Sequence, residues 1–134
     1  MRHLVIPSDG GSGADHALSV ASDAVGPHGT LILISVLPGS LVERHLSPPE
    51  RGRRRRVEEN RAKAALFAQV ARSGLQAECH VIALFGVVVS DTLLIVGNLG
   101  ADGIVMDAGD PDLQEMLAAS PVPVLVVPAQ AEAP

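Results

Sequence analysis

The sequence predicts an α/β domain in which a parallel β-sheet is covered by helices on both faces. Two observations lead to this prediction. Short runs of Val, Leu and Ile recur along the chain without the polar alternation of half-exposed strands, as expected for strands buried on both faces. The segments between these runs are predicted to be helices, so the expected order of elements is β-α-β-α-β-α-β-α-β. A length of 134 residues suits one domain with a single core.

The first three predicted elements are short and end at recognisable breakers. Leu4-Val5-Ile6 predicts a buried strand that Pro7 ends. Residues 12–25 have small and apolar side chains at helical spacing, and Gly26-Pro27 stops the predicted helix. The apolar run 30–37 then predicts a second buried strand.

A long helix is expected in the middle of the chain. Ser47-Pro48-Pro49-Glu50 has the spacing of a capping box with proline at the first helical position, and Gly74 suits a C-terminal cap. Residues 76–84 alternate roughly like a strand and follow this helix.

The last third of the chain predicts two strands and two helices. Residues 87–99 indicate a helix despite their β-branched start. Residues 101–108 and 122–127 predict the last two strands, and Asp110 caps a short helix expected to begin at Pro111. We therefore place the domain at residues 1–128.

Composition excludes several classes of protein. The only aromatic residues are Phe67 and Phe85, so the stacking surface of a single-strand nucleic-acid binder is absent. The net charge of −5 also disfavours nonspecific DNA binding. We expect no membrane span, no secretory signal and a cytoplasmic protein, since the single Cys79 suits a reducing compartment. Residues 129–134 are predicted to be a disordered tail.

The opening and closing strands resemble those of the universal stress protein family. The resemblance rests on residues 4–10 (LVIPSDG), 101–109 (ADGIVMDAG) and 121–127 (PVPVLVV). It implies a Rossmann-like, adenine nucleotide alpha hydrolase-like fold with strand order 3-2-1-4-5. Right-handed crossovers would then place the first two helices on one face and the last two on the other.

The resemblance also implies half of a nucleotide site. A ligand is expected where the strand order reverses, outside the carboxyl ends of the strands. By resemblance Asp9 faces the nucleotide, Val36 lies near the base and Met106 precedes the phosphate loop. The complete set of expected site residues is Pro7, Ser8, Asp9, Val36, Met106 and Gly109.

The phosphate-binding half departs from the family. Its loop, Gly-x2-Gly-x9-Gly-Ser/Thr, needs fifteen positions, whereas residues 107–120 provide fourteen and must also form a helix. Asp107 replaces the first glycine, and Asp110, Asp112 and Glu115 add negative charge that repels a polyphosphate. We expect no cofactor and no ATP binding. The acidic residues are interpreted mainly as helix-capping residues, since Asp110 precedes the predicted helix and Asp112 suits the positive end of its dipole. The alternative, a divalent cation held by these carboxylates, is disfavoured because the spacing lacks the central glycine and the closing glutamate of a calcium loop.

Two other segments have competing interpretations. Gly10-Gly11-Ser12-Gly13 lacks the residues of a nucleotide fingerprint, so a flexible strand-to-helix turn is favoured over a small-anion site. Arg53 to Arg56 form a solvated first helical turn or, alternatively, pair with the acidic turn within the chain or across a dimer. The five histidines show no metal-binding spacing, and no catalytic constellation is evident.

The predicted function follows from these departures. We expect a non-enzymatic stress-response protein that acts through dimerisation and an unknown protein partner, with no metal site. The family's dimers often pair their last strands, and the side chains expected at that interface are Val122, Val124, Leu125, Val126 and Val127. The alternative is a nucleotide- or small-ligand-binding module that uses the half-site around Asp9.

Overall fold

The computed structural model describes residues 1–39 and 45–128. The tail predicted to be disordered, residues 129–134, lies outside the described residues. The ten elements of the described part, in chain order, are β1 (His3–Pro7), a 3-10 turn η1 (Ser12–Ala14), α1 (Asp15–Val25), β2 (Thr30–Leu37), α2 (Pro48–Ser73), β3 (Glu78–Phe85), α3 (Val88–Leu99), β4 (Gly103–Asp107), α4 (Leu113–Ala119) and β5 (Val124–Val127).

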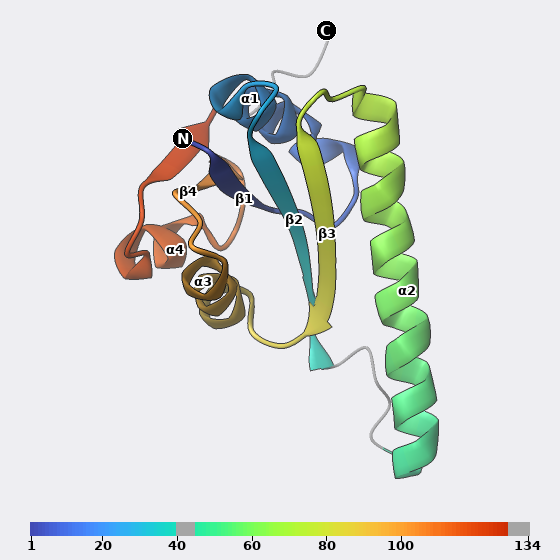
Figure 1. Ribbon diagram of the computed structural model, residues 1–134. Coiled ribbons are helices and arrows are strands. Elements are labelled where there is room, and N and C mark those ends of the chain that lie inside the picture. Colours follow the sequence, from blue (N-terminus) through green and yellow to red (C-terminus); the bar gives the residue numbers. More distant parts are fainter. Residues whose placement is uncertain (40–44, 129–134) are drawn as a thin grey trace, which may run out of the picture.

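The strands form one parallel sheet in the order β3-β2-β1-β4-β5, which confirms the predicted topology. Helices cover both faces (Figure 1). One core lies between the sheet and the first two helices and includes Leu18 and Leu66. The other lies under α3 and α4 and includes Val96 and Met116. The helices are therefore distributed two to each face, as the right-handed crossovers require.

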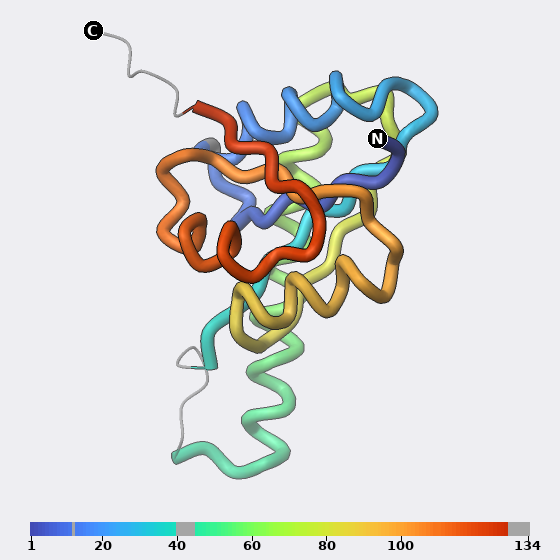
Figure 2. The backbone as a smooth tube through the Cα atoms, turned by 90° about the vertical axis from the view of Figure 1, so that its left-hand side faces the viewer, coloured from blue at the N-terminus to red at the C-terminus, as the bar shows by residue number. Residues whose placement is uncertain are grey.

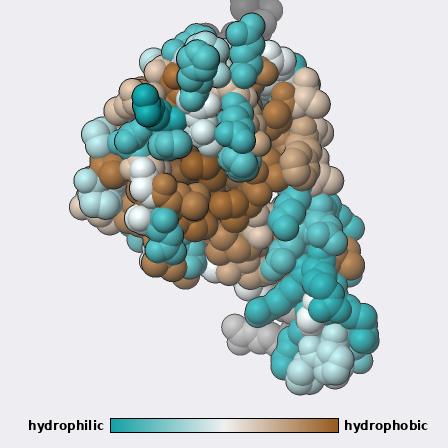
Figure 3. All heavy atoms as spheres, viewed as in Figure 1, coloured by the Kyte–Doolittle hydropathy of each residue, from teal (hydrophilic) through white to brown (hydrophobic). Residues whose placement is uncertain are grey.

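The long helix α2 has the predicted ends. Ser47 Oγ accepts a hydrogen bond from the Glu50 N–H at 3.4 Å, and the helix ends at Gly74, which adopts the left-handed conformation with φ 59°. Its 26 residues span about 39 Å at 1.5 Å per residue. The helix is longer than the sheet, so its first turns project past the carboxyl end of β3 (Figures 1 and 2). Hydrophilic residues cover this projecting end (Figure 3).

The last elements begin later than the sequence indicated. Helix α4 begins at Leu113 rather than Pro111, because two hydrogen-bonded turns precede it: Asp110 N–H donates to the Asp107 carbonyl at 3.0 Å and Leu113 N–H to the Asp110 carbonyl at 3.1 Å. Strand β5 begins at Val124 because the preceding Pro123 has no N–H to donate. The Pro123 carbonyl still accepts from the Ile104 N–H at 3.0 Å.

No helix in the described part of the chain combines the length and the apolarity needed to cross a bilayer.

Gly10 fixes the turn that follows β1. Its φ of 85° lies in the left-handed region, and a Cβ built there would lie 2.6 Å from the Ala65 Cβ on α2. Glycine is therefore required both by the backbone conformation and by the close approach of α2. Gly74, with φ 59°, also lies in the left-handed region, but no atom lies within 4 Å of an added Cβ there.

We predict that Gly10→Ala destabilises the fold more than Gly74→Ala. Gly74→Ala should cost about 1 kcal/mol for the left-handed backbone, whereas Gly10→Ala should cost about 2 to 4 kcal/mol because overlap with α2 is added. Urea unfolding of both variants measures the difference. Equal losses would contradict the tight contact between this turn and α2.

Candidate functional site

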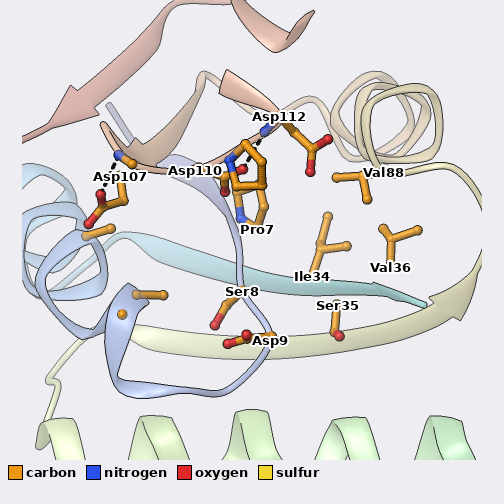
Figure 4. A pocket seen from close by; sticks show the side chains of 15 residues that line it. Pro7, Ser8, Asp9, Ile34, Ser35, Val36, Val88, Asp107, Asp110 and Asp112 are labelled. Atoms are coloured by element: carbon orange, nitrogen blue, oxygen red, sulfur yellow. Dashed lines mark hydrogen bonds between the residues drawn. The ribbon is translucent and has the colours of Figure 1, made fainter. Parts of the chain in front are cut away.

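A cavity of about 430 Å³ opens at the carboxyl edge of the sheet, where the strand order reverses between β1 and β4 (Figure 4). This is the position at which open α/β sheets bind ligands. Its size falls within the usual range of ligand pockets. The lining residues come from the ends of three strands, the start of α1 and α3, and the turn after β4: Pro7, Ser8, Asp9, Gly13, Ala14, Ala17, Ile34, Ser35, Val36, Val88, Asp107, Gly109, Asp110, Pro111 and Asp112.

A difference in strand length creates the cavity. Strand β1 ends at Pro7, which pairs with Ile34, while β2 continues beside β3 to Leu37. The last residues of β2 therefore have no partner on the β1 side. In Figure 4, Ile34 and Val36 rise from β2 on the side where Val88 of α3 lies. The step between the two strands gives the cavity an apolar wall.

The turn after β4 satisfies its own backbone donors. Asp107 Oδ1 accepts from the Gly109 N–H at 2.7 Å, and Asp110 Oδ1 accepts from the Asp112 N–H at 2.8 Å (Figure 4). Such short bonds to a carboxylate are charge-assisted. Backbone N–H groups at a turn of this kind are what a phosphate would bind. Here two of them are already occupied by carboxylates of the same turn.

The cavity is strongly anionic. Its lining includes Asp9, Asp107, Asp110 and Asp112 but, among the described residues, no Lys or Arg. Burial is the main cause that raises the pKa of the Asp110 carboxyl. The neighbouring negative charges of the other three aspartates raise the same pKa further. A polyanionic ligand would therefore be repelled by negative charges that no cationic side chain of the lining compensates.

A buried polar network holds the loop that carries Asp9. Gln69 of α2 is fully buried, and its Oε1 accepts from the Ser8 hydroxyl at 2.8 Å. Its Nε2 donates to Asp15 Oδ1 at 2.9 Å and to the Gly11 carbonyl at 3.3 Å. The Gly10 N–H in turn donates to Ser8 Oγ at 3.0 Å. The amide thus links α2, the β1 loop and the start of α1.

Arg72 closes this network at its solvent side. Its guanidinium donates to both carboxylate oxygens of Asp15, at 3.2 and 3.0 Å, and to the Gly10 carbonyl at 3.0 Å. The hydrogen bond from Arg72 is the main cause that lowers the pKa of Asp15. Gln69 and Arg72 were not among the predicted site residues. The only signal in the sequence was a glutamine in the same helical stripe as Leu66.

The structure brings most of the predicted half-site together. Pro7, Ser8, Asp9, Val36 and Gly109 line the cavity. Met106 does not, because it is buried in the core beneath α3 and α4. Whether these residues bind a ligand stays a prediction.

Three further interpretations can be compared with the geometry. The glycine-rich segment forms a turn and the 3-10 helix η1, and its Gly11 carbonyl accepts a hydrogen bond from Gln69. Within residues 1–39 and 45–128, no ion pair joins Arg53 to Arg56 to the acidic turn. In the same part of the chain, no three His, Cys, Asp or Glu side chains are arranged to hold a metal ion.

We predict opposite effects on stability when Asp110 and Asp15 each lose their charge. The raised pKa of Asp110 means that its ionised form destabilises the fold above that pKa and not below the unfolded value of 3.8. Asp110→Asn should therefore raise the melting temperature at pH 7 and lose this advantage near pH 3. Asp15 has a lowered pKa, so its stabilisation is complete above 3.8 and disappears as the pH falls through the folded pKa.

Asp15→Asn should accordingly lower the melting temperature at pH 7 by an amount that shrinks in acid. Thermal melts from pH 3 to pH 7 compare the two variants. Asp23→Asn, which removes a charge from the exposed side of α1, serves as the control. The same sign of change for Asp110→Asn and Asp15→Asn at pH 7 would contradict this account of the electrostatics.

Comparison with known proteins places the fold. No protein-family model and no curated protein matches the sequence. Among solved structures, the hypothetical protein MJ0577 superposes with a TM-score of 0.78 at 17% identity and covers 98% of both chains. The universal stress protein UspA of Lactobacillus plantarum has a TM-score of 0.74 at 17% identity, over 94% of this chain and 97% of its own. A universal stress protein in complex with cAMP has a TM-score of 0.64 at 13% identity, over 94% and 95%. The chain therefore has the fold of the universal stress proteins.

Proposed function

We propose that this chain is a universal stress protein-like, non-enzymatic protein of the stress response that acts through dimerisation and protein contacts. In this proposal its nucleotide site is degenerate. One observation supports this proposal above all. Two backbone N–H groups of the turn after β4, which a phosphate would need, already donate to carboxylates of the same turn. The four cavity carboxylates add a charge that opposes a triphosphate.

The absence of a catalytic role is supported by the hydrogen-bond partner of the Ser8 hydroxyl in the cavity wall. Ser8 donates to the amide oxygen of Gln69, which is not a base. A nucleophilic serine needs a histidine or another base at this distance. The described lining residues contain no histidine, lysine or cysteine, and the Ser8 hydroxyl donates to Gln69 rather than to one of the four lining aspartates.

Dimerisation through β5 is supported by the exposure of that strand. β5 is an edge strand, paired on one side only, with β4. Val126 is 44% exposed, and Val124 and Leu125 are partly buried. An apolar, unpaired edge favours pairing with another chain. Val127, by contrast, is buried in the core beside α1, and Val122 packs against the core under α3 and α4.

A second candidate function is a small-ligand module. The cavity is large enough for a nucleoside, and its apolar wall favours an uncharged or cationic ligand over a polyphosphate. The structural neighbour that holds cAMP shows that a protein of this fold can carry a nucleotide. In this candidate, Asp9 at the cavity mouth would contact the ligand.

We predict that ATP does not stabilise the protein. Thermal shift with adenosine, AMP, cAMP and ATP at equal millimolar concentrations tests this, because a bound ligand raises the melting temperature. Any effect should decrease as phosphates are added, since each added charge meets the acidic rim. A larger shift with ATP than with adenosine would contradict the degenerate site. A shift with adenosine that Asp9→Ala abolishes would favour the second candidate.

We predict that, at micromolar protein concentration and 500 mM salt, Val126→Lys converts a dimer into a folded monomer. A charge on the strand edge prevents edge-to-edge pairing while leaving the core intact. Leu94→Lys on α3, where the leucine is 61% exposed, is the control and should leave the dimer unchanged. Sedimentation velocity at micromolar concentration measures the oligomeric state. A monomeric parent protein would reject this interface.

A further inference from the structure

The projecting end of α2 carries a cationic surface that contacts between described residues satisfy only in part. We name residues 53–57 of α2 the arginine arm. Arg53, Arg54, Arg55 and Arg56 are all exposed, and they lie in the second and third turns of α2. The arm lies at the carboxyl end of β3, where Arg55 contacts Phe85, and the start of α2 projects past this end in two perpendicular views (Figures 1 and 2).

In the described part of the chain, two of these arginines, Arg54 and Arg55, have partners. Arg54 lies 3.8 Å from the Glu58 carboxylate, and Arg55 stacks over the Phe85 ring at 5.4 Å from its centroid. Arg53 and Arg56 form no ion pair or hydrogen bond with any residue in the described ranges. Three positions apart, they lie on the same side of the helix. The arm therefore presents two free guanidinium groups to one side.

The complementary surface lies at the same edge of the sheet. We name Asp9, Asp107, Asp110 and Asp112 the acidic rim; they line the mouth of the cavity, and none of them is ion-paired among the described residues. The raised pKa of Asp110 agrees with a cluster that lacks a nearby cation. Positive and negative surfaces thus lie at the same end of the molecule, separated by the width of two strands.

The arm does not reach the rim of its own chain. It extends from the helix beside β3, whereas the cavity lies between β1 and β4, two strands further across the sheet. It also projects away from the edge rather than across it (Figure 1). Its free charges are therefore directed toward a second molecule.

We propose that two copies of this chain associate through their carboxyl edges, with the arginine arm of each copy lying on the acidic rim of the other. A surface that carries both an arm and a rim is self-complementary under a two-fold axis, which is how most homodimer interfaces are built. The opposite charges would steer the two copies together and fix their orientation. This contact is separate from the β5 edge.

A second copy fits better than a polyanion. A nucleic acid or an anionic membrane bound to the arm would bring phosphates toward the four rim carboxylates of the same chain. The arm also offers only Val57 as an exposed apolar anchor, which is little for membrane insertion. A partner with its own adjacent positive and negative surfaces avoids this repulsion.

A charge-exchange experiment tests the proposal. All proteins carry Val126→Lys, so that pairing through β5 cannot contribute. The first variant adds Arg53→Glu and Arg56→Glu, and the second adds Asp9→Lys and Asp112→Lys. We expect the Val126→Lys parent to dimerise in 50 mM salt and to do so about tenfold more weakly in 500 mM salt. Each charge-reversed variant alone should be monomeric.

An equimolar mixture of the two variants should dimerise again, because each acidic arm then meets a basic rim. That recovery also shows that both variants are folded. Lys63→Glu, about two turns further along α2, is the control and should leave the association unchanged. Sedimentation velocity at 100 µM protein provides the measurement.

Three results would overturn the proposal. One is a monomeric parent in 50 mM salt, and another is a mixture that stays monomeric. The third is binding of the parent to duplex DNA or to phosphatidylserine vesicles at 150 mM salt that the arm variant loses while self-association is unchanged. The last result would assign the arm to a polyanion. None of the three depends on whether the β5 dimer forms.

Discussion

The structure depends on where the central strand stops. β1 is paired on both sides, and its Leu4, Val5 and Ile6 are completely buried, so it anchors both cores. It ends at Pro7, whereas its neighbour β2 continues three residues further in partnership with β3. The early end of a fully buried strand leaves the step in which the cavity forms. The loop after β1 and the turn after β4 then become the walls of that cavity.

The two walls are held in different ways. The loop after β1 is fixed from below by Gln69 and Arg72 of α2, through hydrogen bonds to side chains and carbonyl groups more than fifty residues away. The turn after β4 is fixed locally, by aspartate side chains that bind N–H groups two residues ahead. The first wall keeps its position as long as α2 is docked. The second is held by hydrogen bonds within the turn itself.

Residues that act locally were predictable from sequence, and residues that act across the fold were not. The apolar runs and the capping sequence at Ser47 predicted nearly every helix and strand, because burial patterns and helix caps depend on residues that are close together in the sequence. The start of α4 was misplaced by two residues, since backbone turns at Asp107 and Asp110 took the place of helix. The network around Gln69 links positions 54 to 61 residues apart, and no local pattern reveals such a pairing. Met106 likewise lies in the core under α3 and α4 rather than in the cavity wall, and the sequence around it does not reveal this placement.

The step between β1 and β2 has a consequence for how this fold can diversify. Because a strand advances about 3.3 Å with each residue, inserting or deleting one residue at the end of β1 would shorten or deepen the hollow in discrete increments. Such a change leaves the buried residues of both cores untouched. A small insertion at this loop would therefore change the depth of the hollow without rebuilding the rest of the domain.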